Sequence, residues 1–386
     1  MNRARIFTPE HEAFRMEVRR FVEKEVMPFH YEWEEQREFP RELWLRAGEL
    51  GLLCANVPEE YGGAGADWLY NAIVIEEFGR AGASGPGSAF MVHSEIVAPY
   101  ILHGPNEAIK REWLPKMVTG EKIGALGMTE PGAGSDLKNI RTRAERNGDE
   151  FIINGQKIFI SNGWKCDFIV LACKTDPEAG AKGISLILAE AEREGFDKGR
   201  KLEKIGLHAA DTAELFFADV RVPVTNMVSE ENGGFKVMMA NLVQERLGQA
   251  VRAVVVCESA IEWTVKYTKE REAFGQTIFD FQNTRFTLAD LDARIAAARA
   301  FTDQCILRMD DGTLDGVTMA QLKLVTMELQ GEVLDKCLQL FGGYGYMREY
   351  PIARAFVDAR LNRIAGGTME VMKHIIGKDL ANRYST

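Results

Sequence analysis

The stretch Gly124–Leu137, which reads GALGMTEPGAGSDL, has the composition of a loop that lies against a ligand. Its glycines let the backbone approach a bound molecule closely, and the hydroxyls of Thr129 and Ser135 can turn toward one. The stretch matches neither the dinucleotide fingerprint G-x-G-x-x-G nor the Walker sequence G-x-x-x-x-G-K-[ST], so it does not name the ligand. Taken alone, it is equally compatible with an ordinary surface turn.

A second candidate for chemistry is Glu245, within the mostly apolar helical run NLVQERLGQAVRAVVV at 241–256. A buried carboxylate there would act as a base, because burial raises its pKa toward the working pH. Gly248, about one turn further on, is expected to leave space beside it. The alternative is an ion pair with Arg246 or Arg252, since a charged residue in a helix is most often solvated or paired.

Helical patterns at both ends of the chain must position these residues. Residues 1–121 read as helical, with a helix start at Thr8-Pro9-Glu10, where a hydroxyl N-cap precedes a proline and an acid. Long helices joined by short loops predict a bundle over residues 232–386, with Glu245 on its first helix. The apolar-periodic segments of that region cover roughly 234–268, 281–310 and 316–341.

The region between the helices, residues 122–231, reads as a compact β domain that begins with the glycine-rich stretch. Asn154-Gly155 interrupts its first strand-forming run and predicts a hairpin turn there. The runs rich in β-branched and aromatic residues are 151–163, 167–175, 183–190 and 212–224.

Composition excludes several classes of function. The formal net charge of −10 argues against a protein that binds nucleic acid or a membrane surface. No apolar run approaches the length of about 18 residues that a membrane span needs. The six cysteines form no CxxC pair and the six histidines no HxxxH pair, so neither disulfides nor a metal site are expected. The N-terminus lacks the apolar segment of a signal peptide, which favours a reducing, cytoplasmic compartment.

Several ordered blocks resemble one enzyme family. They are GMTEPGAGSD at 127–136, KIFISNG at 157–163, DTAELFFADVRVP at 211–223, REAFG at 271–275, QLFGGYGYMREYPIAR at 339–354 and GGT at 366–368. In this order the chain resembles the acyl-CoA dehydrogenases, flavoenzymes that oxidise a CoA thioester between its α and β carbons. The resemblance covers nearly the whole length. It implies an α+β fold: an N-terminal all-α domain over 1–121, a middle β barrel over 122–231 and a C-terminal four-helix bundle over 232–386.

The resemblance also implies an FAD site drawn from distant segments. Phe159-Ile160-Ser161 would pack behind the flavin ring, with Phe159 where most relatives carry tryptophan, and Arg271 would pair with the FAD pyrophosphate of a neighbouring subunit. Taken alone, Phe159 is better explained as β core and Arg271 as part of a solvated helix face, and the glycine pairs could be helix stops with no ligand. Glu130 is expected to be a structural carboxylate. The expected cofactor residues are Leu126, Met128, Thr129, Ser135, Phe159, Ile160, Ser161, Arg271, Phe274, Gln282, Gln339, Leu340, Gly342, Gly343, Gly367, Thr368 and Glu370.

Many members of the family carry their catalytic glutamate directly before the Gly-Thr of the last block, where this chain has Gly366. Glycine cannot accept the α proton. The long-chain and isovaleryl branches place the base within an E-R-L motif on the first bundle helix, and Glu245-Arg246-Leu247 matches it. The resemblance therefore implies Glu245 as base and Gly366 as a backbone N–H donor to the thioester carbonyl. Ser135, Glu245 and Arg246 are expected to bind the acyl-CoA.

The blocks are most similar to the long-chain branch, so a long acyl chain is expected, with a medium or branched chain as the alternative. Small residues such as Gly87 and Ala89 would open a deeper acyl pocket or else serve helix packing. An acyl-CoA oxidase, usually a much longer protein, and a non-catalytic flavoprotein-fold partner are the rival classes. The resemblance implies a homotetramer that passes electrons to an electron-transferring flavoprotein, in a bacterial cytoplasm or, for a eukaryotic protein, the mitochondrial matrix.

Overall fold

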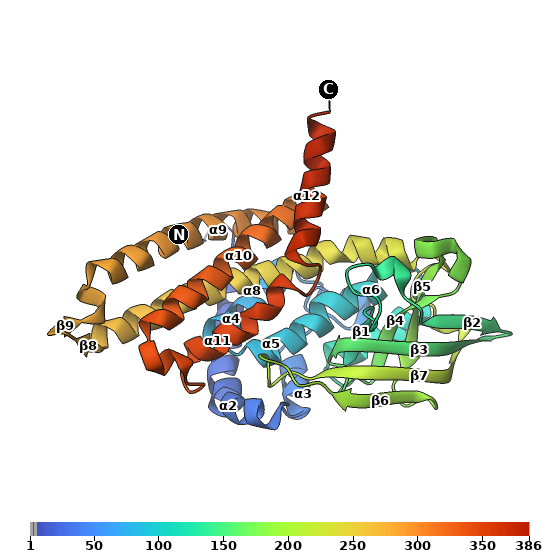
Figure 1. Cartoon of the computed structure of the whole chain (residues 1–386). Coiled ribbons are helices and arrows are strands. Elements are labelled where there is room, and N and C mark those ends of the chain that lie inside the picture. Colours follow the sequence, from blue (N-terminus) through green and yellow to red (C-terminus); the bar gives the residue numbers. More distant parts are fainter. Residues whose placement is uncertain (1–2, 4–5, 386) are drawn as a thin grey trace.

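The computed structural model describes residues 3 and 6–385. Helices come first along the chain, a sheet follows, and helices return to the end, as the sequence predicts (Figure 1). The outermost positions of the expected first and last domains, residues 1–2, 4–5 and 386, lie outside the described residues. The helix α8 (Gly234–Glu270) runs along most of the molecule and contacts α4, β5 and α10, so its side chains reach elements of all three regions.

The N-terminal helices follow the sequence signals closely. Thr8 caps the first helix, where its hydroxyl accepts a hydrogen bond from the backbone N–H of His11. Two π-helical segments, Val22–Val26 and Val92–Val97, interrupt the α-helical pattern. The α-helices are α1 Pro9–Phe21, α2 Met27–Gln36, α3 Glu42–Glu49, α4 Trp68–Ala81, α5 Ser84–Met91, α6 Ala98–Leu102 and α7 Glu107–Val118.

The middle region is a seven-stranded sheet in the order β1-β4-β2-β3-β7-β6, with β5 also paired to β4. β1 and β4 are parallel, which brings the glycine-rich stretch beside a strand that is buried along its whole length. The strands are β1 Gly124–Gly127, β2 Arg143–Asn147, β3 Glu150–Ser161, β4 Phe168–Lys174, β5 Ile184–Glu190, β6 Phe196–Lys201 and β7 Thr212–Pro223.

The expected hairpin turn at Asn154-Gly155 is wrong. β3 continues through both residues, with a register shift against β7, and the hairpin turn lies between Asn147 and Glu150. Gly155 allows a close crossing instead, because a Cβ there would lie 2.6 Å from the Cα of Thr142. The sequence Asn147-Gly148 carries the same turn signal, so the rule identified the right kind of turn at the wrong pair.

The C-terminal region is helical and is built around α8. Apolar residues of α8, α9 and α10, among them Val254, Leu291 and Val333, form one buried cluster. The N-terminal helices lie close against it, since a Cβ on Gly79 of α4 would approach Val255 Cγ1 to 2.5 Å. The elements after α8 are the short hairpin β8 Glu272–Ala273 and β9 Gln276–Thr277, α9 Gln282–Asp310, α10 Gly316–Leu340, α11 Pro351–Ala359 and α12 Met369–Arg383.

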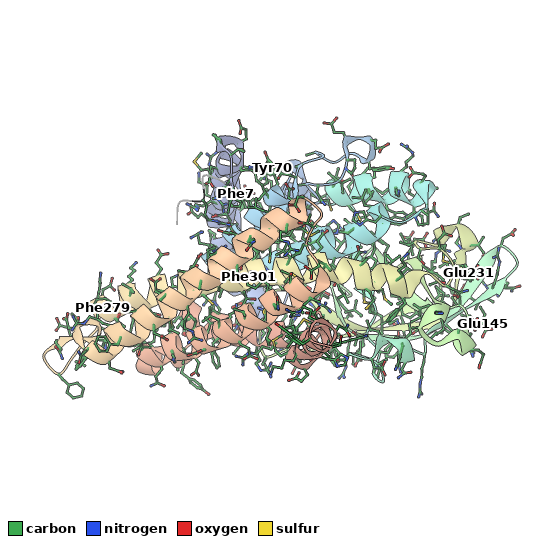
Figure 2. The ribbon with its side chains drawn as sticks, turned by 90° about the horizontal axis from the view of Figure 1, so that it is seen from above. Phe7, Tyr70, Glu145, Glu231, Phe279 and Phe301 are labelled. Carbon is green, nitrogen blue, oxygen red and sulfur yellow. The ribbon has the colours of Figure 1, made fainter. Side chains whose placement is uncertain are left out.

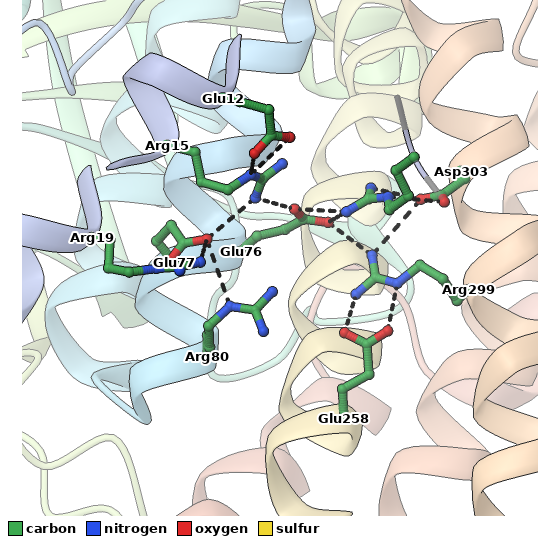
Figure 3. Close-up of polar contacts among 10 residues, drawn as sticks. Glu12, Arg15, Arg19, Glu76, Glu77, Arg80, Glu258, Arg299 and Asp303 are labelled. Atoms are coloured by element: carbon green, nitrogen blue, oxygen red, sulfur yellow. Dashed lines mark hydrogen bonds and ion pairs between the residues drawn. The ribbon is translucent and has the colours of Figure 1, made fainter. Parts of the chain in front are cut away.

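A network of buried ion pairs connects the N-terminal helices to this bundle (Figure 3). The carboxylate of Glu76 on α4 accepts hydrogen bonds from Arg15 of α1 at 2.7 Å and from Arg3 and Arg299 at 2.8 Å. Burial raises the pKa of Glu76, but the three guanidinium groups outweigh it and hold that pKa below its ordinary value. The network therefore keeps its charges at neutral pH and fixes α4 against α8 and α9.

Candidate active site

Glu245 lies on α8 with its side chain almost wholly buried, 6% exposed. The hydroxyl of Tyr100 on α6 donates a hydrogen bond to its Oε1 at 3.0 Å. Both arginines proposed as ion-pair partners have other acceptors. Arg246 Nε donates to the carbonyl of Gly366 at 2.8 Å, and Arg252 donates to Ser88 Oγ and Asn362 Oδ1, each at 2.8 Å. The ion-pair alternative is therefore wrong.

Burial sets the proton affinity of this carboxyl group. It raises the pKa of Glu245 to about 7, although the Tyr100 hydroxyl and the cations of Arg246 and Lys323 oppose the rise. A carboxylate with a pKa near the working pH is a stronger base than an exposed one and is still substantially ionised. Glu245 thus has the protonation behaviour that a general base needs.

The loop Ala365–Gly367, which enters α12, lies against the same part of α8. Arg246 holds the Gly366 carbonyl, and Lys323 Nζ donates to the Ala365 carbonyl. A Cβ on Gly366 would lie 3.0 Å from Nε2 of Gln249, which is four residues after Glu245 on α8. The structure therefore brings the two expected catalytic positions together around one face of α8.

Two physical reasons explain why position 366 is a glycine. Its φ is +68°, in the left-handed region that side chains disfavour, and the space beside it is taken by Gln249 and Lys323. Neither Gln249 nor Lys323 was expected in the site. Lys323 is four residues from both Met319 and Met327, which are buried, so helical periodicity places it on the buried face of α10.

The expected space beside Gly248 is absent. A Cβ there would lie 3.2 Å from Met91 Sδ and 3.3 Å from Ile75 Cδ1, so these side chains fill the position. Gly87 likewise faces Phe78, whose Cβ would be 2.7 Å away. Both glycines allow close helix packing, which is the alternative that the sequence left open for Gly87.

Glu130 fixes the glycine-rich stretch from inside. Its carboxylate accepts the N–H groups of Arg141 and Thr142 and a hydrogen bond of 2.8 Å from the fully buried ammonium of Lys157. Lys157 also donates to the carbonyl of Met128 at 3.1 Å. Burial raises the pKa of Glu130, but Lys157 and the other donors outweigh it and keep that pKa below its ordinary value. Glu130 is thus a structural carboxylate, as expected.

The outer surface of this stretch is open to a ligand. Leu126, Met128 and Thr129 are half-buried and Ser135 is exposed. The glycine at 134 has no atom within 4 Å of the position a Cβ would occupy. Backbone and hydroxyl groups here are accessible to a bound molecule.

Phe159 is presented outward beside that surface. Its side chain is 64% exposed and its φ is +62°, at a bulge of β3 against β7. The β-core alternative is therefore wrong. A large aromatic residue held exposed in a left-handed conformation costs about 1–3 kcal/mol, a cost typical of positions that contact a ligand. Ile160 is buried and Ser161 is half-buried. A flat aromatic ring system fits this surface.

Most of the remaining expected FAD residues form a second group at the far end of the bundle. Phe274, at the tip of the β8–β9 hairpin, is 96% exposed with φ +53°, and the Arg271 guanidinium lies 5.9 Å from the centre of the Tyr344 ring. Gln282 begins α9 and Leu340 ends α10, next to this hairpin. The other members here are the exposed residues Gln339, Gly342 and Gly343.

One chain does not bring the two groups together. The β8–β9 hairpin and the sheet lie at opposite ends of the molecule in Figure 1. Figure 2 shows the same separation from above, with Phe279 beside the hairpin and Glu145 and Glu231 at the sheet end. A site that uses both groups must therefore combine two copies of the chain.

The residues after Gly366 cap the last helix. Thr368 is the N-cap of α12, where its hydroxyl accepts from the N–H of Val371 at 3.4 Å, and Glu370 is exposed in the first turn. Gly367 has φ +99° and lies beside Arg246, whose Nη2 would be 3.2 Å from a Cβ there. These residues lead directly from the Ala365–Gly367 loop to a helix N-terminus, which favours an anion.

Two further findings concern only residues 3 and 6–385. No group of three or more His, Cys, Asp or Glu side chains among them is arranged to hold a metal ion. None of the helices described is long and apolar enough to span a membrane.

Comparison with known proteins gives matches along nearly the whole chain. The N-terminal domain model of the acyl-CoA dehydrogenases matches residues 8–121, the middle domain model 125–220 and the C-terminal domain model 232–381. The chain is 47% identical over 381 residues to the mitochondrial long-chain specific acyl-CoA dehydrogenase of Rattus norvegicus, covering 98% of this chain and 88% of that protein.

Two other relatives show how broad the similarity is. The mitochondrial isovaleryl-CoA dehydrogenase of Pongo abelii is 35% identical over 373 residues, covering 96% of this chain and 88% of that protein. The crystal structure of an acyl-CoA dehydrogenase from Geobacillus kaustophilus superposes with a TM-score of 0.95 at 45% identity, covering 97% of this chain and 99% of that one. The chain therefore belongs to the acyl-CoA dehydrogenase family, FAD-dependent oxidoreductases that act on CH–CH bonds.

Proposed function

We propose that this enzyme oxidises a long-chain acyl-CoA to the trans-2-enoyl-CoA, in fatty-acid oxidation, with Glu245 as the base that removes the α proton. One observation carries the proposal. Glu245 is a buried carboxylate whose pKa is raised to about 7, and it lies on the face of α8 that also holds the Gly366 loop. Glu245 would then supply the base and Gly366 the backbone donor for one thioester.

The chain's own groups supply the proton chemistry. The α proton of a thioester is too weakly acidic for a free carboxylate, so negative charge that develops on the carbonyl oxygen must be stabilised. The backbone N–H of Gly366 would do this while Glu245 accepts the α proton, and the C–H electron pair becomes the new double bond. When bound, FAD supplies the acceptor for the hydride that leaves the β carbon.

The exposed surfaces fit FAD. Met128, Thr129, Phe159 and Ser161 would hold the flavin ring, because they form an accessible wall with an aromatic side chain turned outward. The second group, at the far end of the bundle and called the distal group from here on, would hold the adenosine diphosphate part of a neighbouring subunit's cofactor. The forked guanidinium of Arg271 suits a pyrophosphate. The separation of the two groups supports an oligomer, for which the family resemblance implies a homotetramer.

Sequence similarity supports the long-chain assignment. Identity is 47% to a long-chain specific relative and 35% to an isovaleryl-CoA dehydrogenase. A medium- or branched-chain substrate is the second candidate; the branched chain is favoured by the base position, which the resemblance places on the first bundle helix in the long-chain and isovaleryl branches alike. An electron-transferring flavoprotein is the proposed acceptor. The named relatives support a location in the mitochondrial matrix or in a bacterial cytoplasm.

The test is an anaerobic titration of the FAD-loaded enzyme with saturated acyl-CoAs from four to eighteen carbons and with isovaleryl-CoA. The long chains should bleach the flavin fastest. A clear preference for the medium or branched substrates would replace the long-chain assignment. The absence of bleaching with every thioester would contradict α,β-dehydrogenation itself.

A further inference from the structure

Lys323 is a fully buried lysine in the first half of α10, and it has no role in the chemistry proposed above. Its neighbours one turn away on the same face, Met319 and Met327, are apolar and buried. Burying an ammonium group is costly, because the charge loses its hydration. A lysine that served only to fill this position would be replaced at lower cost by an apolar side chain.

The contacts of Lys323 point to the catalytic loop. Its Nζ donates to the side-chain carbonyl of Gln249 at 2.9 Å and to the backbone carbonyl of Ala365. It would lie 3.2 Å from a Cβ on Gly366. Lys323 therefore joins the α8 face that carries Glu245 to the Ala365–Gly366 peptide, which contains the Gly366 N–H.

We propose that Lys323 is a positioning residue for the dehydrogenation, a proposal that rests on the proposed role of Glu245 as the base. Its ammonium group fixes the Ala365–Gly366 peptide so that the Gly366 N–H faces the thioester carbonyl. Its positive charge favours the ionised form of Glu245, the form that accepts the α proton.

The groups around the pair determine the direction of the electrostatic effect. Glu245 faces the Tyr100 hydroxyl of α6, the Arg246 cation of α8 and the Lys323 cation of α10, and all three favour its ionised form. Lys323 faces Arg246, which repels it, and Glu245, which attracts it. Burial, followed by Arg246, lowers the pKa of Lys323 to about 7. Glu245 and Lys323 therefore titrate as a coupled pair, and loss of the ammonium raises the pKa of Glu245.

The test compares pH profiles of the FAD-loaded enzyme, using the acyl-CoA that reduces the wild type fastest. In Lys323→Met the acidic limb of kcat/KM should move up by about one pH unit, because an opposite charge near the carboxylate is lost. The kcat at its pH maximum should also fall by at least about tenfold, because the loop loses its anchor. Lys323→Arg keeps the charge and should leave the limb near its wild-type position, whatever its rate.

Two further variants make the result decisive. Thr326→Val lies on the same buried stretch of α10 and removes only a hydroxyl that donates to the backbone carbonyls of Leu322 and Lys323, so it leaves the Lys323 ammonium in place and should not move the acidic limb. Lys323→Gln removes the charge with little change of volume. If the methionine variant does not fold, the position of the acidic limb of kcat/KM is measured in this variant instead. An unmoved limb in the Gln or Met variant would overturn the proposal for Lys323. Failure of the wild type to reduce its flavin would instead overturn the proposed function.

Discussion

Replacement of Glu245 by glutamine should change how the stability of the enzyme depends on pH. The ordinary pKa of this carboxyl is 4.5 and burial raises it to about 7 in the folded protein. In the unfolded chain the group loses its proton above about pH 4.5, whereas the folded protein retains it up to about pH 7. The folded state therefore loses stability as the pH rises through this window.

The size of the effect follows from the shift. A pKa rise from 4.5 to about 7 corresponds to roughly 3 kcal/mol, since each pKa unit is about 1.4 kcal/mol. Unfolding entropy near about 2.1 cal/mol/K per residue gives roughly 0.8 kcal/mol/K for 386 residues. The full effect is then about 4 °C in Tm. Glutamine does not titrate, and it keeps an oxygen that accepts the Tyr100 hydrogen bond.

The assay is thermal unfolding of the FAD-loaded wild type and Glu245→Gln at pH 4.5 and pH 8. The Tm of the variant minus that of the wild type should be about 4 °C larger at the higher pH. Lys323 is present in both proteins, so its own titration largely cancels from this difference. A Tm difference that is the same at both pH values would refute the raised pKa and with it the desolvation of Glu245.

Three other changes test separate parts of the structure. Tyr100→Phe removes the hydroxyl that favours ionised Glu245, so the acidic limb of kcat/KM should move up by about one pH unit, with the FAD spectrum unchanged. Lys157→Met leaves the Glu130 carboxylate buried without its cation and should lower the unfolding free energy by about 3–5 kcal/mol. Adding Glu130→Gln to this variant should restore part of the lost unfolding free energy. A double variant that restores none would contradict the pairing of Lys157 with Glu130. Phe274→Ala removes an exposed aromatic side chain from the distal group and should weaken both FAD retention and assembly, measured by absorbance and light scattering. An unchanged FAD content and mass would contradict a cofactor site shared between copies.

Local sequence signals predicted the elements well where one interaction dominates. The hydroxyl-proline-acid start at Thr8 gives a capped helix, and the apolar periodicity of 316–341 gives α10 at Gly316–Leu340. The turn at Asn154-Gly155 was misplaced, because tertiary crowding at Thr142 selects glycine there for its lack of a Cβ. Propensity rules reflect the backbone conformation that a residue type prefers, and they carry no information about the residues that pack against it in the fold.

The site shows the same limit. Glu245 stands out from the sequence because a charge in an apolar run is unusual. That Arg246 and Arg252 donate to other acceptors could be known only from their positions in three dimensions. The space expected beside Gly248 could not be judged from the sequence, because Met91 and Ile75 come from helices far away in the chain. Packing partners from distant segments decide whether a small residue makes a pocket or a contact.

The most direct test of the central claim is the single-turnover rate of flavin reduction in Glu245→Gln, mixed anaerobically with excess long-chain acyl-CoA at pH 8. Glu95→Gln is the matched control, because Glu95 is another buried carboxyl on which burial raises the pKa to about 7. With FAD bound in all three proteins, Glu245→Gln should reduce its flavin at least about a thousandfold more slowly than the wild type, and the control should stay within about tenfold. A Glu245→Gln enzyme that reduces its flavin at the wild-type rate would contradict the assignment of Glu245 as the base.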